Sequence, residues 1–216
     1  MDTTAIETRY NKLATDNCCL SCGSAMIYAD AAAREICVDL GSGRGTDVLR
    51  LAGAVGPGGF VYGVDVADDM LEKARNNAEK LGIKNVRFVK SNLENIPIPG
   101  GIVNLVISNC TINHAQNKQA VWNEIYRLLT KGGRFAVSDI YSLEDVPDVY
   151  RNDPVAVAEC WAGAVRKELY LDMVRKSGFE SIRIIEESSP YKKGRIEITS
   201  FTLAGTKPGD CGCCDG

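Results

Sequence analysis

The stretch ICVDLGSGRGTDVLRLAGAVGPGGFVYGVD, residues 36–65, decides the fold of this chain. An apolar run at its start leads into three closely spaced glycines, Gly41, Gly43 and Gly45. Apolar residues then recur at helical spacing, and a second apolar run ends in Asp65. The pattern predicts a strand, a tight turn, a helix and a second strand, which is a unit that binds nucleotide-like cofactors.

The three glycines and Asp65 have distinct physical roles in such a unit. A glycine adopts positive φ easily and lets a ligand approach the backbone, while the amides at the start of the helix point toward that ligand. Asp65, at the end of the second strand, can accept hydrogen bonds from both hydroxyls of a ribose. The spacing is not the dinucleotide fingerprint, because the third glycine comes one residue early and Thr46 fills the last place. It predicts a different nucleoside, and an ordinary tight turn is the alternative.

Composition restricts the class of protein. With 216 residues and 45% hydrophobic content, we expect one globular domain with a small appendage. The net charge of −3 is small and mixed, which argues against a nucleic-acid partner. No apolar run approaches the roughly 18 residues of a membrane span, and the N-terminus lacks a basic-then-apolar signal, so we expect no membrane partner and a cytoplasmic protein. The sequence does not determine the oligomeric state.

Strands and helices alternate over the first 140 residues, which predicts right-handed crossovers and a parallel sheet. We expect helices at 3–14, 47–52, 68–81 and 120–129, and strands at 36–40, 60–65, 86–89, 102–107 and 134–139, the last entered by a turn at Gly132-Gly133. The tail predicts helices near 154–165 and 167–177 and an antiparallel strand pair near 179–187 and 196–205. The expected divisions are an N-terminal helix and Cys-rich loop (1–34), a cofactor-binding domain (35–206) and a flexible Cys-rich tail (207–216).

In a doubly wound sheet, ligands lie at the carboxyl ends of the strands, where the strand order reverses. The residues that follow the first four strands therefore share one crevice. They are Gly41 to Gly45, Asp65, Asn92, Leu93, Asn109 and Cys110.

Nine cysteines are many for this length, and without a secretion signal they indicate reactive or metal-binding thiols rather than disulfides. They form one cluster near the start (Cys18, Cys19, Cys22), one at the end (Cys211, Cys213, Cys214), and three isolated positions (Cys37, Cys110, Cys160). Cys37, inside the first strand, is expected to be a buried core residue. The single histidine, His114, argues against a histidine-based metal site or a catalytic triad.

The pattern Asp39-x-Gly41-x-Gly43-x-Gly45 resembles motif I of the class I S-adenosylmethionine methyltransferases. The resemblance implies a Rossmann-like α/β fold, with a mostly parallel seven-stranded sheet in the order 3-2-1-4-5-7-6, helices on both faces and an antiparallel C-terminal hairpin. Asn92 and Leu93 would meet the adenine, and Asp39 would orient the loop or meet the methionine ammonium. The implied cofactor-binding residues are Asp39, Gly41, Ser42, Gly43, Gly45, Asp65, Asn92, Leu93 and Asn109.

Three further segments resemble the arsenite S-adenosylmethionine methyltransferases. They are ISNCTIN (107–113), the stretch 128–133 with SDIY (138–141), and AECWAGA (158–164). The resemblance implies that Cys110 and Cys160 bind trivalent arsenic, with a further ligand from Cys18, Cys19 or Cys22, and that a thiol reductant is a co-substrate. Thiolates suit a soft ion, and the arsenic lone pair is itself the nucleophile, so no general base is required. The chain is short for this family, and its upstream segment has three cysteines where one is expected.

Two alternatives stay open at this point. The first is a methyltransferase for a small organic acceptor, with cysteines that take no part in the chemistry. The second assigns Cys19-x-x-Cys22 and the C-terminal cysteines to a structural zinc or metal-buffering site. The tail either passes metalloid to the active site or has no role.

Overall fold

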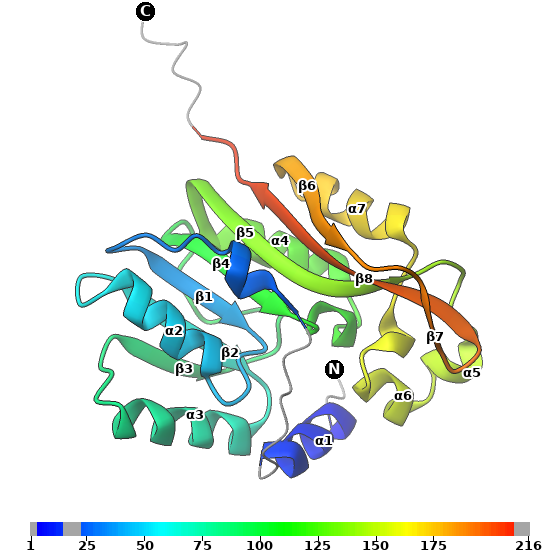
Figure 1. Ribbon diagram of the computed structural model, residues 1–216, viewed down its shortest axis with the longest axis horizontal. Coiled ribbons are helices and arrows are strands. Elements are labelled where there is room, and N and C mark those ends of the chain that lie inside the picture. Colours follow the sequence, from blue (N-terminus) through cyan, green and yellow to red (C-terminus); the bar gives the residue numbers. More distant parts are fainter. Residues whose placement is uncertain (1–3, 15–22, 210–216) are drawn as a thin grey trace, which may run out of the picture.

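The computed structural model describes residues 4–14 and 23–209. Its strands form one mixed sheet in the order β3-β2-β1-β4-β5-β8-β6, with β7 paired to β8 (Figure 1). The strands are β1 (Ile36–Leu40), β2 (Phe60–Asp65), β3 (Val86–Lys90), β4 (Val103–Asn109), β5 (Leu129–Ser142), β6 (Glu180–Glu187), β7 (Tyr191–Lys193) and β8 (Ile196–Thr206). The first five are mutually parallel, whereas β6, β7 and β8 pair antiparallel. The predicted fold class and strand order are confirmed, with β8 in the place of the predicted seventh strand.

Helices cover both faces of this sheet. The α-helices are α1 (Thr4–Ala14), α2 (Thr46–Val55), α3 (Asp68–Lys80), α4 (Lys118–Leu128), α5 (Asp148–Arg151), α6 (Pro154–Ala158) and α7 (Lys167–Lys176). Short 3-10 helices are η1 (Ala25–Tyr28), η2 (Ile112–His114) and η3 (Trp161–Gly163). In Figure 1, α2 and α3 lie in front of the sheet, and α4 and α7 lie behind it.

Alternation along β1 explains why two hydrophobic layers form. Val38 and Leu40 pack with side chains of α4 and α7, such as Trp122 and Tyr170. Cys37 points to the other layer, with side chains of η1, α2 and α3. Burial raises the pKa of the Cys37 thiol to about 12, so this cysteine is an inert core residue, as predicted.

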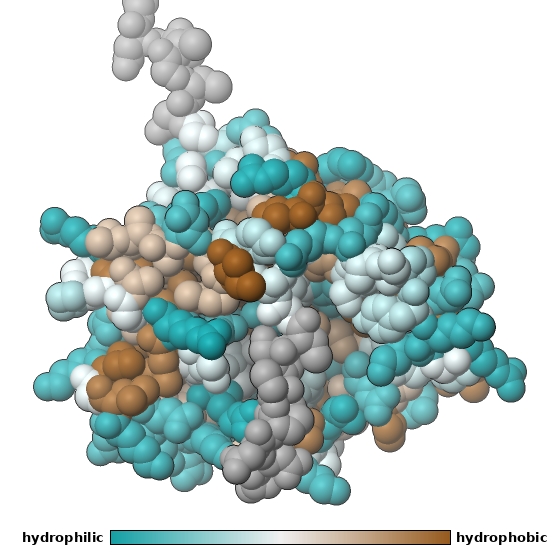
Figure 2. Space-filling model, viewed as in Figure 1, coloured by the Kyte–Doolittle hydropathy of each residue, from teal (hydrophilic) through white to brown (hydrophobic). Residues whose placement is uncertain are grey.

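The outer surface is ordinary for a globular protein. Figure 2 shows hydrophilic side chains over much of the viewed face and hydrophobic ones in small separate patches. Among the described residues, no helix combines the length and the apolar character needed to cross a membrane.

Two elements differ from the prediction. The helix expected near 154–165 is broken, because α6 ends at Ala158 and Cys160 has a φ of 76° before η3 begins. The break has a packing cause: a Cβ on Gly163 would lie 1.9 Å from the carbonyl oxygen of Asn113, so this segment approaches η2 too closely for a continuous helix. The predicted turn at Gly132-Gly133 instead lies inside β5, next to a register shift against β4. The short β7 was not predicted.

Candidate active site

A cavity of about 250 Å³ lies at the carboxyl ends of the parallel strands. Every predicted cofactor-binding residue except Gly45 lines it: Asp39, Gly41, Ser42, Gly43, Asp65, Asn92, Leu93 and Asn109. Cys110 also forms part of its wall, and Ile6 and Tyr10 reach it from α1. The topology therefore gathers the ends of β1, β2 and β4 and the loop after β3 into one crevice, as the sequence predicted.

The glycine loop needs its glycines for two different reasons. Gly41, Gly43 and Gly45 have φ values of 73°, 49° and 79°. A Cβ on Gly41 would lie 2.0 Å from the hydroxyl oxygen of Thr111, so this position is fixed by close packing. A Cβ on Gly43 would meet nothing nearer than the sulfur of Met70 at 4.0 Å, which leaves room for a ligand beside its backbone.

Asp65 holds the loop in place. Its carboxylate accepts hydrogen bonds from the backbone amides of Gly43 (2.8 Å) and Ala67 (2.9 Å). Burial raises the pKa of Asp65, and these hydrogen bonds oppose the rise. The predicted contact with a ribose stays a prediction.

Asp39 and Ser42 are two crevice side chains that a ligand would help to satisfy, and Glu94, which also lines the crevice, has a buried oxygen without a hydrogen-bond partner among the described residues. Burial, with the nearby charges of Asp47 and Asp65, holds the pKa of Asp39 well above its ordinary range. The Ser42 hydroxyl is buried and has no hydrogen-bond partner among the described residues. A cationic, hydrogen-bonding molecule would compensate the buried charge of Asp39 and give the Ser42 hydroxyl a hydrogen-bond partner. S-adenosylmethionine, which carries an ammonium and a sulfonium group, fits this donor and charge set.

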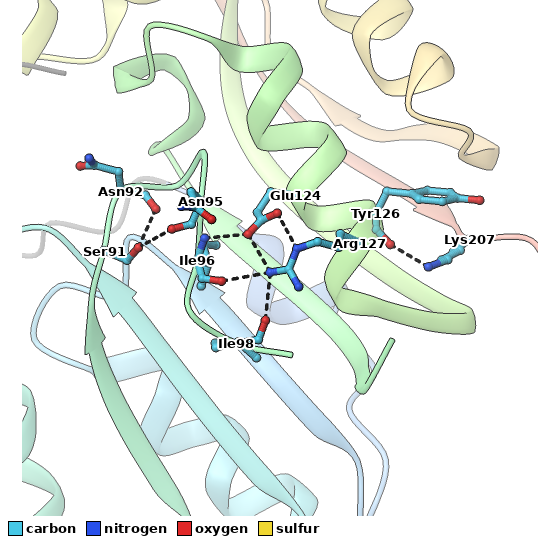
Figure 3. Close-up of polar contacts among 9 residues, drawn as sticks. All are labelled: Ser91, Asn92, Asn95, Ile96, Ile98, Glu124, Tyr126, Arg127 and Lys207. Atoms are coloured by element: carbon cyan, nitrogen blue, oxygen red, sulfur yellow. Dashed lines mark hydrogen bonds and ion pairs between the residues drawn. The ribbon is translucent and has the colours of Figure 1, made fainter. Parts of the chain in front are cut away.

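The loop after β3 is fixed from α4. Figure 3 shows Glu124 accepting a hydrogen bond from the Ile96 amide (2.6 Å) and Arg127 donating to the carbonyl oxygens of Ile96 (3.0 Å) and Ile98 (2.9 Å). A salt bridge of 2.7 Å joins Glu124 and Arg127. This clamp fixes the loop that brings Asn92 into the crevice.

Cys110 and Cys160 meet although 50 positions separate them. The Cys160 thiol donates a hydrogen bond to the carbonyl oxygen of Cys110 at 3.1 Å. Both residues have positive φ, 53° and 76°, which costs a residue with a side chain about 1–3 kcal/mol. The surrounding fold maintains this strained pair, and Cys110 stands at the edge of the cofactor crevice.

Asp139 lies beside this pair and was not predicted. Its carboxylate accepts hydrogen bonds from the Asn113 side chain (2.8 Å) and the Ile140 amide (2.9 Å), and it lies 3.8 Å from the Cys160 sulfur. Burial raises the pKa of Asp139 to about 6. The sequence could have indicated Asp139, because it lies in β5, the strand that pairs with β4, which carries Asn109 and leads into Cys110.

Tyr10 and His114 were also missed as site residues. The His114 Nδ1 donates to the carbonyl oxygen of Val157 (3.0 Å), so its Nε2 accepts from the Tyr10 hydroxyl (3.0 Å). Burial lowers the pKa of His114 to about 4, which keeps the ring neutral. With both nitrogens occupied, His114 has none left for a metal ion.

The other predicted metal ligands, Cys19 and Cys22, lie outside the described residues, as do Cys18 and the C-terminal cysteines. Within residues 4–14 and 23–209, no group of three or more His, Cys, Asp or Glu side chains is arranged to hold a metal ion.

Comparison with known proteins gives a consistent result. Residues 33–178 match the family model described as a methyltransferase domain. The arsenite methyltransferase of Halobacterium salinarum is 40% identical over 174 residues, which is 80% of this chain and 44% of that protein. The human arsenite methyltransferase is 35% identical, over 68% of this chain and 42% of that protein. This chain thus spans less than half the length of these relatives.

Solved structures agree. The arsenic (III) S-adenosylmethionine methyltransferase of Chlamydomonas reinhardtii matches 95% of this chain and 74% of its own, with a TM-score of 0.74 and 28% identity. A phosphoethanolamine N-methyltransferase of Haemonchus contortus has the same TM-score of 0.74 at 15% identity, which shows the fold alone. The predicted resemblance to arsenite methyltransferases is confirmed.

Proposed function

Because the chain belongs to the methyltransferase-domain family, we propose that it transfers a methyl group from S-adenosylmethionine to trivalent arsenic held by thiolates. The meeting of Cys110 and Cys160 at the edge of the cofactor crevice supports this proposal more than any other observation. A buried Cys160 beside a partly buried Cys110, both in strained backbone, has no evident structural use, whereas two such cysteines suit a soft, thiophilic substrate.

The crevice residues would bind and orient the methyl donor. Asp39 supplies negative charge for its cationic groups, the open side of Gly43 admits it next to the backbone, and Asn92 and Leu93 border the adenine end. Bound there, S-adenosylmethionine supplies an electrophilic methyl group and keeps the electron pair of the broken carbon–sulfur bond.

The thiols would convert arsenite into a positioned nucleophile. Each thiol that binds replaces one arsenic–oxygen bond with an arsenic–sulfur bond, and its proton leaves with the hydroxide as water. The arsenic keeps a lone pair, and this pair forms the new arsenic–carbon bond. The protein acts mainly by placing the reacting atoms about 3–3.5 Å apart. Methylation oxidises the arsenic from +3 to +5, so a thiol reductant is required, which suits a reducing cytoplasm.

The upstream ligand, in our proposal, is one of Cys18, Cys19 and Cys22, which lie outside the described residues. Gly23, the first described residue after this cluster, packs so tightly that an added Cβ would lie 2.2 Å from the side-chain oxygen of Asn109, the residue before Cys110. The described chain after the cluster therefore starts beside the residue that precedes Cys110.

The test compares wild type with Cys110→Ser, Cys160→Ser and, as a control, Cys37→Ala. Arsenite binding and methylated arsenic products are measured with S-adenosylmethionine and a thiol reductant present. We expect both serine variants to lose product while still binding S-adenosylhomocysteine, and Cys37→Ala to retain both properties. Equal turnover by all four proteins would exclude thiolate capture and leave a methyltransferase for another small acceptor.

The zinc alternative concerns cysteines outside the described residues, and metal analysis of the purified protein tests it. About one tightly bound zinc per chain would assign Cys19 and Cys22 to a structural site. In that result, arsenite capture by Cys110 and Cys160 alone would still be measurable.

A further inference from the structure

A second cavity, of about 530 Å³, meets the cofactor crevice at one residue. Among the described residues, only Cys110 lines both cavities. The second cavity lies between Ser24, which precedes η1, and the strands β5, β8 and β6. Cys110 can therefore be reached without passing through the space that the methyl donor would fill.

The cavity has a buried end and an exposed end. Ser138, Asp139 and Thr202 are 3%, 2% and 2% exposed and form the end near Cys110, whose amide donates to the Ser138 carbonyl oxygen (2.8 Å). Glu187 and Ser188, near the end of β6, are exposed and form the mouth. The lining thus leads from solvent to Cys110.

Hydroxyl groups and carboxylates dominate the polar wall. The hydroxyl of Thr202 lies 2.8 Å from that of Ser24 and 2.8 Å from that of Ser138, and Ser24 donates to Glu186. No lysine, arginine or histidine is found among the described residues that line this wall; the nearby Lys167 forms a salt bridge with Glu187 at the mouth (2.6 Å), which leaves Glu186 and Asp139 without a cationic partner in the lining. Such a surface accepts hydrogen bonds from a neutral polyhydroxy molecule and repels oxyanions.

We propose that this second cavity is the access route and first binding site for arsenite in its neutral form, As(OH)₃. The inference rests on the proposed function. It adds the path by which arsenite reaches Cys110 and a reason why neutral arsenite is preferred over anions. Neutral As(OH)₃ carries three hydroxyl donors that match the hydroxyl and carboxylate wall, whereas arsenate and phosphate are anions at neutral pH. Arsenite reaches Cys110 from one cavity, and the methyl donor occupies the other.

The first experiment follows arsenite capture by the absorbance of arsenic–thiolate bonds in a stopped-flow instrument, with and without saturating S-adenosylhomocysteine. Separate routes predict the same capture rate in both cases. If arsenite entered through the cofactor crevice, the bound nucleoside would slow capture strongly, and that result would overturn the inference. No variant is needed for this test.

The second experiment blocks the mouth. Ser188→Trp places a large side chain on the cavity wall, and Ser189→Trp places the same side chain one residue away, outside the lining. We expect Ser188→Trp to slow capture about tenfold, within the range by which access alters association rates, and to leave the final arsenic stoichiometry unchanged. Ser189→Trp should match wild type.

These results separate the inference from the proposed function. No capture by wild type at all would contradict the proposed function itself. Normal capture by wild type with equal rates for Ser188→Trp and Ser189→Trp would contradict only the route. Unchanged affinity for S-adenosylhomocysteine in both tryptophan variants confirms that they fold.

Discussion

At the residue scale, Cys110 has a strained backbone conformation, for which the proposed arsenic-binding role would account. Its φ of 53° suits glycine, and a side chain there is strained. We therefore expect Cys110→Gly to have a free energy of unfolding about 1 kcal/mol higher than Cys110→Ala, although both lose arsenite binding. Urea unfolding measures the difference.

The matched control for that comparison is Cys37, which lies in the regular strand β1. There the order should reverse, with Cys37→Gly less stable than Cys37→Ala by about 0.5–1 kcal/mol. If glycine and alanine were equally stable at position 110, the backbone strain at the thiol pair would be refuted.

His114 makes stability depend on pH. Its pKa is about 4 in the folded protein and about 6.5 when unfolded, so below pH 6.5 the unfolded state binds the extra proton. The free energy of unfolding therefore falls as pH drops from about 6.5 to 4, by about 3 kcal/mol in all. Lys118 and Arg9 disfavour the charged ring further.

Comparing wild type with His114→Gln isolates this contribution, because glutamine can still donate to Val157 and accept from Tyr10. The comparison also removes the opposite trend from Asp139, whose raised pKa favours the folded state as pH falls below about 6. The variant should lose less stability than wild type between pH 7 and pH 5 in urea unfolding. Parallel curves would mean that His114 titrates normally.

Some site residues could be predicted from their own place in the sequence, and others could not. Gly41, Asp65 and Cys110 each follow a strand, and strand ends in such a sheet share one edge. Tyr10 and His114 are separated by 104 positions, and their hydrogen bond depends on where α1 docks. No local pattern encodes that docking.

At the scale of elements, α1 closes one side of the cofactor crevice. It is tied to α3 by hydrogen bonds from Lys73 to the Ala14 carbonyl oxygen (2.6 Å) and from the Asp69 amide to Asn11 (3.2 Å). Tyr10 projects from it into the crevice and bonds to His114. Contacts to α3 and η2 thus hold a helix that has only one buried residue, Ala14, among those the structure describes.

Removing the Tyr10 hydroxyl should loosen this closure. A lost neutral hydrogen bond costs about 1 kcal/mol, so we expect Tyr10→Phe to weaken S-adenosylhomocysteine binding about fivefold. Calorimetric titration measures the affinity, and Tyr62→Phe, on β2 against the α4–α7 layer, is the control. Equal affinities for both variants and wild type would show that α1 does not contribute to the cofactor site.

The break between α6 and η3 could not be predicted from the local sequence. The sequence predicted a helix near 154–165, and the small residues Ala162, Gly163 and Ala164 allow close packing. The close packing is real, but it brings Gly163 against Asn113 and forces the chain to turn at Cys160. Local propensity was overridden by a tertiary contact, and this same turn directs the Cys160 thiol toward Cys110.

At the scale of the whole molecule, the sheet borders two cavities that meet at Cys110. The ends of β1 and β2 face the cofactor crevice, while β5, β6 and β8 border the second cavity. The first arrangement could be predicted from the motif and the topology. The second could not. β6 and β8 border this cavity because of their antiparallel pairing, and the periodicity of the sequence does not determine the residue-by-residue register of that pairing.

Two such sites predict independent stabilisation by two ligands. S-adenosylhomocysteine at a hundred times its dissociation constant should raise the free energy of unfolding by about 2.7 kcal/mol, equally in wild type and in Cys110→Ser. Arsenite should add a further increase in wild type and none in the serine variant, since its bonds to Cys110 are lost. Urea unfolding with each ligand alone and with both gives the coupling between them. A combined effect well below the sum of the two would show that the ligands compete for one space, and Cys110 would then lie inside the cofactor site rather than at its border.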